Sequence, residues 1–356
     1  MSQEQEVSHP AHLEPSELGT KEYWDNYYQN GLDNEEDSNG AEDDDDDDDE
    51  DLPPHLLQLE SWFDDVGAPT KTSEFLTSTS FPLSPNYVST KDEGGKSTSS
   101  ELGHDLRIIE ERPTVLDLGT GNGSVLFALR IEGQYTGRMV GVDYSSQSIE
   151  LARKLARQYL PSASISTSNS NSMTDSNASS SEITFEVLDI IHDDPTVQAW
   201  WPKTTASIAA GSEEGPCAGF DLVLDKGTFD AISLSSSIVT DATTDRTQRI
   251  CELYPAKVLA MVKPGGFFLV TSCNWTEEEV VTWFTGISTV ADHAVGAGAS
   301  ANASESESEN AEGIEIKGKS RGKGRFEVYD RIKYPVFEFG GHKGQGVASV
   351  CFKKVW

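Results

Sequence analysis

The segment that most constrains the fold is a short β-rich run that leads directly into a glycine-rich turn and then a helix. Residues 114–118 read Thr-Val-Leu-Asp-Leu, residues 119–123 read Gly-Thr-Gly-Asn-Gly, and residues 124–130 contain good helix formers. Glycines in such a turn let the backbone pass close beneath a ligand, because no side chain stands in the way. This order of strand, tight turn and helix predicts the first unit of a parallel α/β sheet.

The same unit repeats along the chain. Ser145 can cap a second helix, and the apolar run 267–271 is typical of a strand buried in a parallel sheet. This alternation predicts a doubly wound α/β sheet. The runs 325–339 and 346–355 are joined by a glycine-rich stretch without a helix, which predicts an antiparallel C-terminal hairpin. Strands are expected at 114–118, 139–143, 183–188, 220–224 and 267–271, and a helix at 250–262.

Long polar stretches separate these units. The run from Glu42 to Asp51 is acidic throughout, and its charges repel one another and keep their water, so it is expected to stay solvated. We therefore expect a single domain over 19–356 after a disordered N-terminus at 1–18. Disordered low-complexity insertions are expected at about 33–51, 70–104, 161–182, 203–217 and 291–324.

Charge and cysteine content restrict the possible partners. A formal charge of −33 argues against direct nucleic-acid binding, because phosphate recognition needs a basic surface. A basic protein partner suits this charge, although the acidic run could also serve solubility alone. The four cysteines lie far apart without a CxxC pair, so we expect free thiols in a reducing compartment and no metal site. No apolar run is long enough for a membrane span, and we expect a cytoplasmic monomer, with the nucleus as an alternative location.

The glycine spacing distinguishes between ligands. The turn reads GxGxG, whereas a dinucleotide site needs the third glycine one residue later. This difference disfavours a dehydrogenase and favours a ligand without a pyrophosphate, although a tight turn with no ligand would also use glycines.

Carboxylates at the ends of the predicted strands are candidate ligand contacts. Asp143 ends the second strand, where it can accept both hydrogen bonds from a ribose diol or instead cap the next helix. Asp117 lies in an apolar run, so it needs backbone or ligand donors. Asp189 follows the third strand and can accept from an adenine amino group while Ile190 packs on the ring, or it can serve the turn alone.

The acceptor side is expected after the fourth strand. Asp225 could orient or deprotonate an acceptor amine there, and Phe229 could line an acceptor channel or belong to the core. Near the N-terminus, the aromatic cluster 23–28, which includes Trp24, could cover the cofactor as a lid or anchor an N-terminal helix.

Several motifs together resemble the translation elongation factor 1-alpha lysine methyltransferases. This family resemblance covers most of the foldable chain, and it departs from the family only in the acidic run, the serine-rich insertions and the segment before Gly313. Its motifs are Leu116-Asp-Leu-Gly-Thr-Gly-Asn-Gly123, Gly141-Val-Asp-Tyr-Ser145, Asp225-Lys-Gly-Thr-Phe-Asp-Ala-Ile-Ser233, Thr271-Ser-Cys-Asn-Trp-Thr276, Gly19-Thr-Lys-Glu-Tyr-Trp24, Ser61-Trp-Phe-Asp64 and Phe337-Glu-Phe-Gly-Gly341.

The resemblance implies a Rossmann-like seven-stranded methyltransferase sheet, S-adenosylmethionine as cofactor, and a lysine of elongation factor 1-alpha as substrate. Asp117 would then support the methionine end of the cofactor. Two alternatives stay open: a small-molecule methyltransferase would share every cofactor motif, and an interaction module could bind the cofactor without activity. The implied cofactor contacts are Trp24, Asp117, Gly119, Thr120, Gly121, Asn122, Gly123, Asp143, Tyr144, Asp189 and Ile190.

Overall fold

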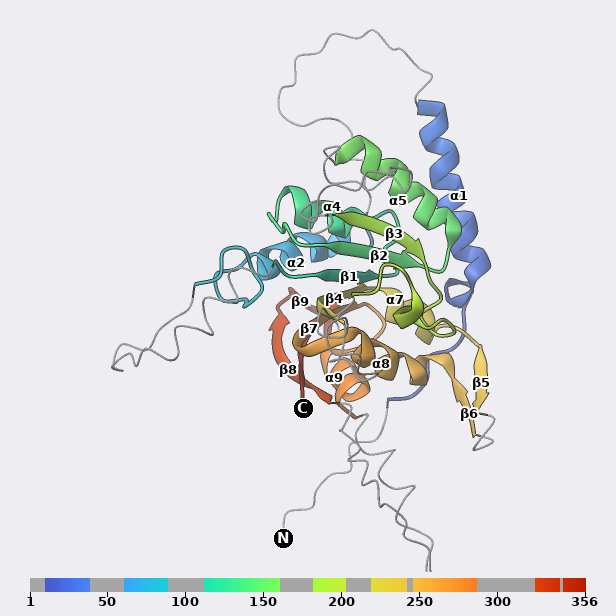
Figure 1. Ribbon diagram of the computed structural model, residues 1–356. Coiled ribbons are helices and arrows are strands. Elements are labelled where there is room, and N and C mark those ends of the chain that lie inside the picture. Colours follow the sequence, from blue (N-terminus) through green and yellow to red (C-terminus); the bar gives the residue numbers. More distant parts are fainter. Residues whose placement is uncertain are drawn as a thin grey trace, which may run out of the picture.

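The fold is built on a seven-stranded sheet with the strand order β3-β2-β1-β4-β7-β11-β8 (Figure 1). The computed structural model describes residues 10–38, 61–88, 112–160, 182–202, 219–241, 246–286, 324–339 and 342–356. The strands of this sheet are β1 (Val115–Leu118), β2 (Met139–Asp143), β3 (Ile183–Val187), β4 (Phe220–Lys226), β7 (Val262–Ser272), β8 (Arg325–Ile332) and β11 (Ala348–Val355). The five strands predicted from sequence are therefore confirmed.

The first five strands in this spatial order run parallel to one another. Chain order reverses between β1 and β4, because β2 and β3 lie on one side of β1 while β4 and β7 lie on the other. In doubly wound sheets, ligands bind outside the carboxyl ends of the strands at such a reversal. The topology thus marks the ends of β1 and β4 as the place to look for a site.

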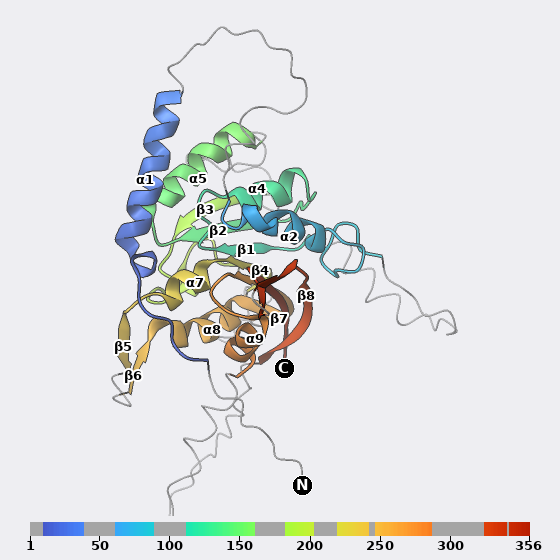
Figure 2. The same ribbon diagram turned by 180° about the vertical axis from the view of Figure 1, so that it is seen from behind.

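Helices cover both faces of the sheet (Figures 1 and 2). Leu116 and Leu118 face a core shared with one set of helices, whereas Val115 faces a core shared with the other set. This alternation follows from the two-residue period of a strand. The first core contains side chains of α7 (Thr228–Ser233), α8 (Ile250–Met261) and α9 (Glu277–Thr285), and the second contains side chains of α1 (Lys21–Ser38), α2 (Ala68–Leu76), α4 (Ser124–Ile131) and α5 (Ser146–Tyr159).

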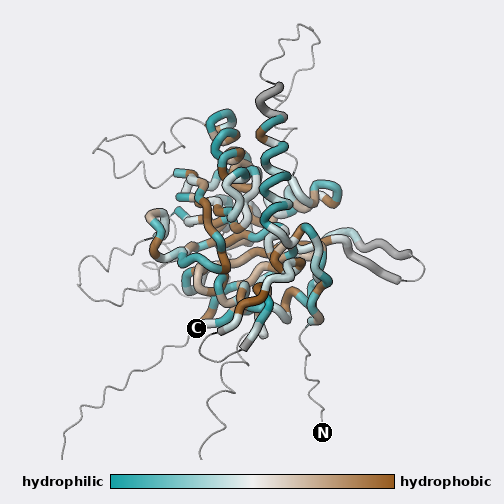
Figure 3. The backbone as a smooth tube through the Cα atoms, turned by 90° about the vertical axis from the view of Figure 1, so that its right-hand side faces the viewer, coloured by the Kyte–Doolittle hydropathy of each residue, from teal (hydrophilic) through white to brown (hydrophobic). Residues whose placement is uncertain are grey.

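Local sequence signals explain where these helices begin. The Ser145 hydroxyl accepts a hydrogen bond from the backbone N–H of Ser148 at 3.3 Å, so the predicted cap of α5 is confirmed. Thr276 and Glu279 form a capping box at the start of α9. Apolar segments gather in the sheet at the centre of the molecule, whereas the outward part of α1 is largely hydrophilic (Figure 3). Among the helices described, none is long and apolar enough to span a membrane.

The C-terminal strands form an antiparallel addition to the sheet, as predicted, but with a different layout. β11 pairs antiparallel with both β7 and β8, so it lies between them. The run 325–339 is not one strand: it divides into β8 and β9 (Val336–Phe339). The sequence also predicted that residues 340–344 only join two strands. This prediction is wrong in part, because β10 (His342–Gln345) pairs with β9 in a small separate hairpin.

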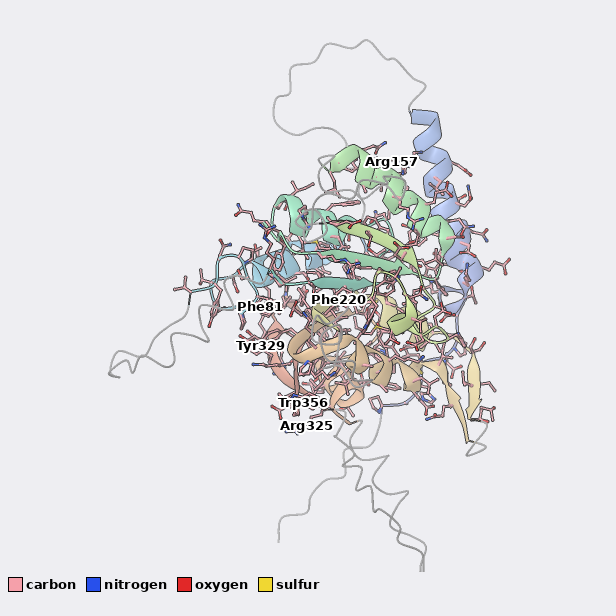
Figure 4. The ribbon with its side chains drawn as sticks, viewed as in Figure 1. Phe81, Arg157, Phe220, Arg325, Tyr329 and Trp356 are labelled. Carbon is pink, nitrogen blue, oxygen red and sulfur yellow. The ribbon has the colours of Figure 1, made fainter. Side chains whose placement is uncertain are left out.

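Part of the chain that composition predicted to be disordered is folded. The expectation for 70–104 is wrong over 70–88, where α2 and the turns after it pack on the sheet. Leu76 and Phe81 are fully buried there, and Phe81 contacts Phe267 and Tyr329 with ring centroids 5.1 and 6.3 Å away (Figure 4). Burial of a few aromatic and aliphatic side chains outweighs the Ser- and Thr-rich composition between them.

The expected disorder at 1–18 and 33–51 also needs correction. Residues 10–18 are described, and the backbone N–H of Ser16 donates to the Leu234 carbonyl at 3.0 Å. α1 continues to Ser38, inside the second of these stretches. Residues 39–51 and 89–104, and almost all of the insertions predicted at 161–182, 203–217 and 291–324, lie outside the described residues.

A small hairpin that the sequence analysis did not predict projects from the molecule beside this N-terminal segment. It consists of β5 (Ile238–Asp241) and β6 (Arg246–Arg249) (Figure 1). The guanidinium of Arg249 donates to the carbonyls of Leu13, Ser233 and Ser235 at 2.8, 3.1 and 2.5 Å. One side chain therefore joins the N-terminal segment, the end of α7 and the hairpin.

Candidate active site

A cavity of about 490 Å³ lies at the carboxyl ends of β1, β2 and β4, where the strand order reverses. Its walls come from the turns after these strands, from the turn after β3 and from two N-terminal segments, 18–28 and 61–63. Its size is within the range of small-molecule and cofactor sites. The fold thus brings together residues that are more than 200 positions apart in the sequence.

The glycine-rich turn forms the floor of the cavity. Gly119, Thr120, Gly121 and Asn122 line it, as the sequence predicts. Gly121 has a φ of +58°, and a Cβ at this position would lie 2.6 Å from the Tyr28 hydroxyl. Any side chain at Gly121 would therefore disturb both the backbone and the helix above it.

Gly123 is needed for packing. It is not among the residues that line the cavity. Its φ is +83°, and a Cβ would lie 2.9 Å from the rings of Phe127 and Phe185. The third glycine therefore allows α4 to pack closely on β3, and its predicted cofactor contact stays a prediction.

Asp143 lies at the end of β2 with its carboxylate held by the backbone. Its oxygens accept hydrogen bonds from the N–H groups of Gly121 at 3.1 Å and Ser145 at 2.9 Å. Burial raises the pKa of this carboxyl, and these hydrogen bonds oppose the rise. Asp143 and its neighbour Tyr144 both line the cavity, so the structure places them where the sequence expected a ribose contact. The carboxylate also fixes the glycine turn, which a simple helix cap would not do.

Asp117 lines the cavity from within β1. Its carboxylate accepts a hydrogen bond from the Thr120 hydroxyl at 2.7 Å, which supplies one of the donors that its burial requires. Burial raises the pKa of Asp117 to about 6, although the Thr120 bond and the nearby Lys226 ammonium act in the opposite direction.

The turn after β3 adds an apolar wall. Asp189 and Ile190 both line the cavity, and Ile190 is buried. The Asp189 carboxylate accepts from the N–H groups of Ile191 and His192 at 2.9 and 3.1 Å, and it contacts the His192 ring nitrogen Nδ1 at 2.9 Å. Asp189 therefore organises the turn and also borders the cavity, and its predicted contact with an adenine amino group stays a prediction.

Asp225 and Phe229, the two residues predicted to contact the acceptor, do not line the cavity. The Asp225 carboxylate is 2% exposed and accepts from the Thr228 N–H at 2.8 Å and the Tyr254 hydroxyl at 2.6 Å. Phe229 is fully buried, and its ring stacks on Tyr254. Asp225 therefore holds the first turn of α7 in place, and Phe229 belongs to the core. Direct contact of either side chain with an acceptor stays a prediction.

Two charged residues that sequence reasoning left unassigned lie where Asp225 was expected. Lys226 and Asp230 both line the cavity. The Asp230 carboxylate accepts from the Ser272 hydroxyl at 2.5 Å and the Cys273 N–H at 2.9 Å, and burial raises its pKa. Strand alternation is the signal that could have found Lys226, because neighbouring residues of β4 face opposite sides.

Aromatic rings from the two N-terminal segments line one side of the cavity. We call Trp24, Tyr27, Trp62 and Phe63 the aromatic rim; all four line the cavity. Trp24 contacts Trp62 with ring centroids 5.3 Å apart, and its Nε1 donates to the Leu18 carbonyl at 2.8 Å. Trp24 therefore anchors α1 and also lines the cavity, and its predicted role as a lid over the cofactor stays a prediction.

The donors and acceptors of this cavity suit a nucleoside-sized organic ligand. A narrow glycine floor, a backbone-fixed carboxylate and an apolar wall occur together, and within the described residues no group of three or more His, Cys, Asp or Glu side chains could hold a metal ion. Pockets of this kind bind a ligand through its shape and a few placed polar groups.

Comparison with known proteins gives a consistent picture. A family model described as "Methyltransferase domain" matches residues 109–323. The chain is 28% identical to "Protein-lysine N-methyltransferase EFM4" of Saccharomyces cerevisiae over 97% of both chains. It is 29% identical to "Protein-lysine N-methyltransferase efm4" of Schizosaccharomyces pombe over 96% of this chain and 95% of that one. It is 24% identical to "EEF1A lysine methyltransferase 2" of Danio rerio over 96% of this chain and 89% of that one.

Proposed function

The chain belongs to the methyltransferase-domain family, and from this premise we propose that it is a cytoplasmic protein-lysine N-methyltransferase that uses S-adenosylmethionine to methylate translation elongation factor 1-alpha. The names of its relatives in two yeasts support methylation of a protein lysine, and the name of the Danio rerio relative supports EEF1A as the substrate. Those relatives align along almost the whole chain, so the likeness includes the acceptor side of the cavity as well as the cofactor side.

The cofactor fits the residues present. The glycine floor leaves the space that a Cβ would fill, Asp143 presents a carboxylate to a ribose diol, and Ile190 offers an apolar surface to an adenine ring. Asp117 lines the cavity from within β1 and would face the methionine end. When bound, S-adenosylmethionine supplies a methyl group on a positively charged sulfur.

The protein's own contribution is to place the acceptor amine in line with that methyl group. A lysine side chain is protonated in water near pH 7, so it must lose a proton before its nitrogen can attack. Asp230 is the carboxylate that the cavity presents on the acceptor side, and Asp225 fixes the turn that carries it. Asp230 attracts the ammonium and, because burial raises its pKa, can accept the proton, after which the free amine takes the methyl group and S-adenosylhomocysteine leaves.

A single observation carries the proposal. The same cavity contains the surfaces that suit a nucleoside and an aromatic rim whose rings are partly exposed. Tyr27 and Trp62 line the cavity and are 40% and 39% exposed, so the cavity wall reaches the surface at the rim, where a long side chain from another protein can enter. A fully enclosed cavity would instead suit a small-molecule acceptor.

The test is methylation of purified elongation factor 1-alpha with radiolabelled S-adenosylmethionine, followed by mass spectrometry of the labelled band. We expect label on lysine with the wild-type protein and none with Asp143→Asn. Glu132→Gln, an exposed change at the end of α4, serves as the matched control and should keep full activity. Label found only in small molecules of a cell extract would favour a small-molecule methyltransferase. Cofactor binding without any label would favour an interaction module.

A further inference from the structure

Two rings of the aromatic rim stay exposed although the rings of the rim pack against one another. Trp24, Tyr27 and Trp62 contact one another with ring centroids between 5.3 and 6.2 Å apart, and Trp62 contacts Phe63 at 6.5 Å. Tyr27 and Trp62 nevertheless stay more than a third exposed. Large rings at the mouth of a cavity with this much open surface are typical of a binding site.

The backbone at Phe63 is strained in a way that serves this rim. Phe63 has a φ of 71°, in the left-handed region that a residue with a bulky side chain rarely adopts. Its ring lies 3.4 Å from where a Cβ of Gly227 would be, at the cavity wall. A strained residue held against a cavity is a recurrent mark of functional sites, because the surrounding structure must offset its cost.

The rim already holds an alkylammonium group of the protein itself. The Lys226 Nζ lies 5.9 Å from the centroid of the Phe63 ring and donates to the Trp62 carbonyl at 3.3 Å. The nearby carboxylates of Asp64, Asp117 and Asp225 act to raise the pKa of Lys226, against the lowering by burial. Burial therefore lowers the pKa of Lys226, while one ring face, the Trp62 carbonyl and nearby carboxylates stabilise an alkylammonium group at this wall.

We infer that the aromatic rim binds the side-chain ammonium of the acceptor lysine and binds it more tightly with each methyl group that the lysine gains. This inference rests on the proposed function and adds to it a subsite that recognises the methylation state.

The physical reason is the balance between hydration and ring contact. Each methyl group replaces an N–H donor, so the ammonium loses hydration while it keeps its full charge. The face of a tryptophan or tyrosine ring attracts such a cation, and aromatic sites favour quaternary ammonium groups for this reason. Product that stays bound at the rim can be methylated again before it is released.

The probe set is Nα-acetyl-lysine methylamide with zero, one, two or three methyl groups on its side-chain nitrogen. Its Kd for the full protein, saturated with S-adenosylhomocysteine, can be measured by saturation-transfer NMR. We expect the trimethylated probe to bind roughly three- to thirtyfold more tightly than the unmethylated one. Four equal affinities, or no binding of any probe, would overturn the inference.

Variants at Trp62 separate ring electrostatics from general apolar contact. Trp62→Leu keeps an apolar side chain without a ring and should remove the dependence on methylation, whereas Trp62→Phe should keep most of it. Tyr87→Ala removes another exposed ring, 44% exposed and outside the cavity, and should change nothing. A wild-type midpoint in urea denaturation would show that each variant is folded. If Trp62→Leu keeps the full dependence, the rim is not the binding site.

These measurements are independent of the elongation factor. A dependence on methylation without activity on that protein would retain the rim and reject the proposed substrate. Activity without such a dependence would retain the proposed function and reject the rim.

Discussion

Replacing Gly121 by alanine should damage both the fold and the cofactor site, and a second glycine in the chain provides the matched control. Gly121 and Gly265 both have positive φ, +58° and +80°. A Cβ at Gly265 would meet no atom within 4 Å, whereas a Cβ at Gly121 would lie 2.6 Å from the Tyr28 hydroxyl. Gly265→Ala therefore isolates the backbone strain, and Gly121→Ala adds a steric clash to it.

The expected magnitudes follow from these distances. A left-handed backbone costs an alanine about 1–2 kcal/mol, which is the whole expected loss for Gly265→Ala. Ordinary contacts begin near 3.4 Å, so the Tyr28 hydroxyl would have to move by 3.4 − 2.6 = 0.8 Å. Tyr28 is 8% exposed and packs on the rings of Trp24 and Tyr27, so it has little freedom to move. Overpacking of this kind costs about 1–3 kcal/mol, which gives about 2–5 kcal/mol in total for Gly121→Ala.

Urea denaturation of both variants measures the free energy of unfolding, and calorimetry measures the affinity for S-adenosylhomocysteine. Gly265→Ala should leave that affinity unchanged, because Gly265 does not line the cavity. Gly121→Ala should lower it at least tenfold. Equal unfolding free energies for the two variants would refute the steric argument, because they would mean that Tyr28 moves aside without cost.

Three further changes test individual contacts. Asp143→Asn should lower the affinity for S-adenosylhomocysteine, measured by calorimetry, at least tenfold. It should also lower the unfolding free energy by about 1–3 kcal/mol, because an amide NH₂ must then face the N–H of Gly121 or Ser145. Wild-type affinity would contradict the ribose role. Asp225→Asn should flatten the loss of stability between about pH 4 and pH 7 in urea titrations. Burial raises the pKa of Asp225 from 3.8 to about 7, so over this range the folded state keeps a proton that the unfolded state has released, and stability falls as the pH rises; an unchanged slope would count against this assignment. Tyr135→Phe should cost about 1–3 kcal/mol in the same assay, because the buried Tyr135 hydroxyl donates to the Leu76 carbonyl at 2.8 Å; a neutral effect would show that this carbonyl finds another donor.

The sequence predicted the parts of the fold that depend on local pattern. Strands β1, β2, β3, β4 and β7 and the cap at Ser145 were predictable, because hydrophobic runs, turn residues and capping side chains act over a few neighbouring positions. α2 was missed because its helix is stabilised by the burial of Leu76 under the sheet and not by its own composition. The residues between Leu76 and Phe81 are polar, so the local sequence pattern does not show that this segment folds. Its fold depends on contacts with residues that are distant in the sequence.

The candidate site was predictable in position but not in the direction that each side chain faces. The sequence placed Asp225 at the end of a strand on the correct edge of the sheet. Which of two neighbours faces the cavity depends on the register of β4 against β1, and in the structure that side chain is Lys226. The rim was half predicted, because Trp24 was assigned to the site while Trp62 entered only through the family resemblance.

The position of β11 between β7 and β8 sets the order in which this protein can be completed during synthesis. β11 leaves the ribosome after both of its neighbours, and β8 pairs within the described sheet only with β11. Until residues 348–355 emerge, the nascent chain exposes the unpaired edge of β7, and β8 has no strand to join. Such edges invite pairing with other chains. The interval before β11 emerges is therefore when a newly made copy of this protein most needs a chaperone.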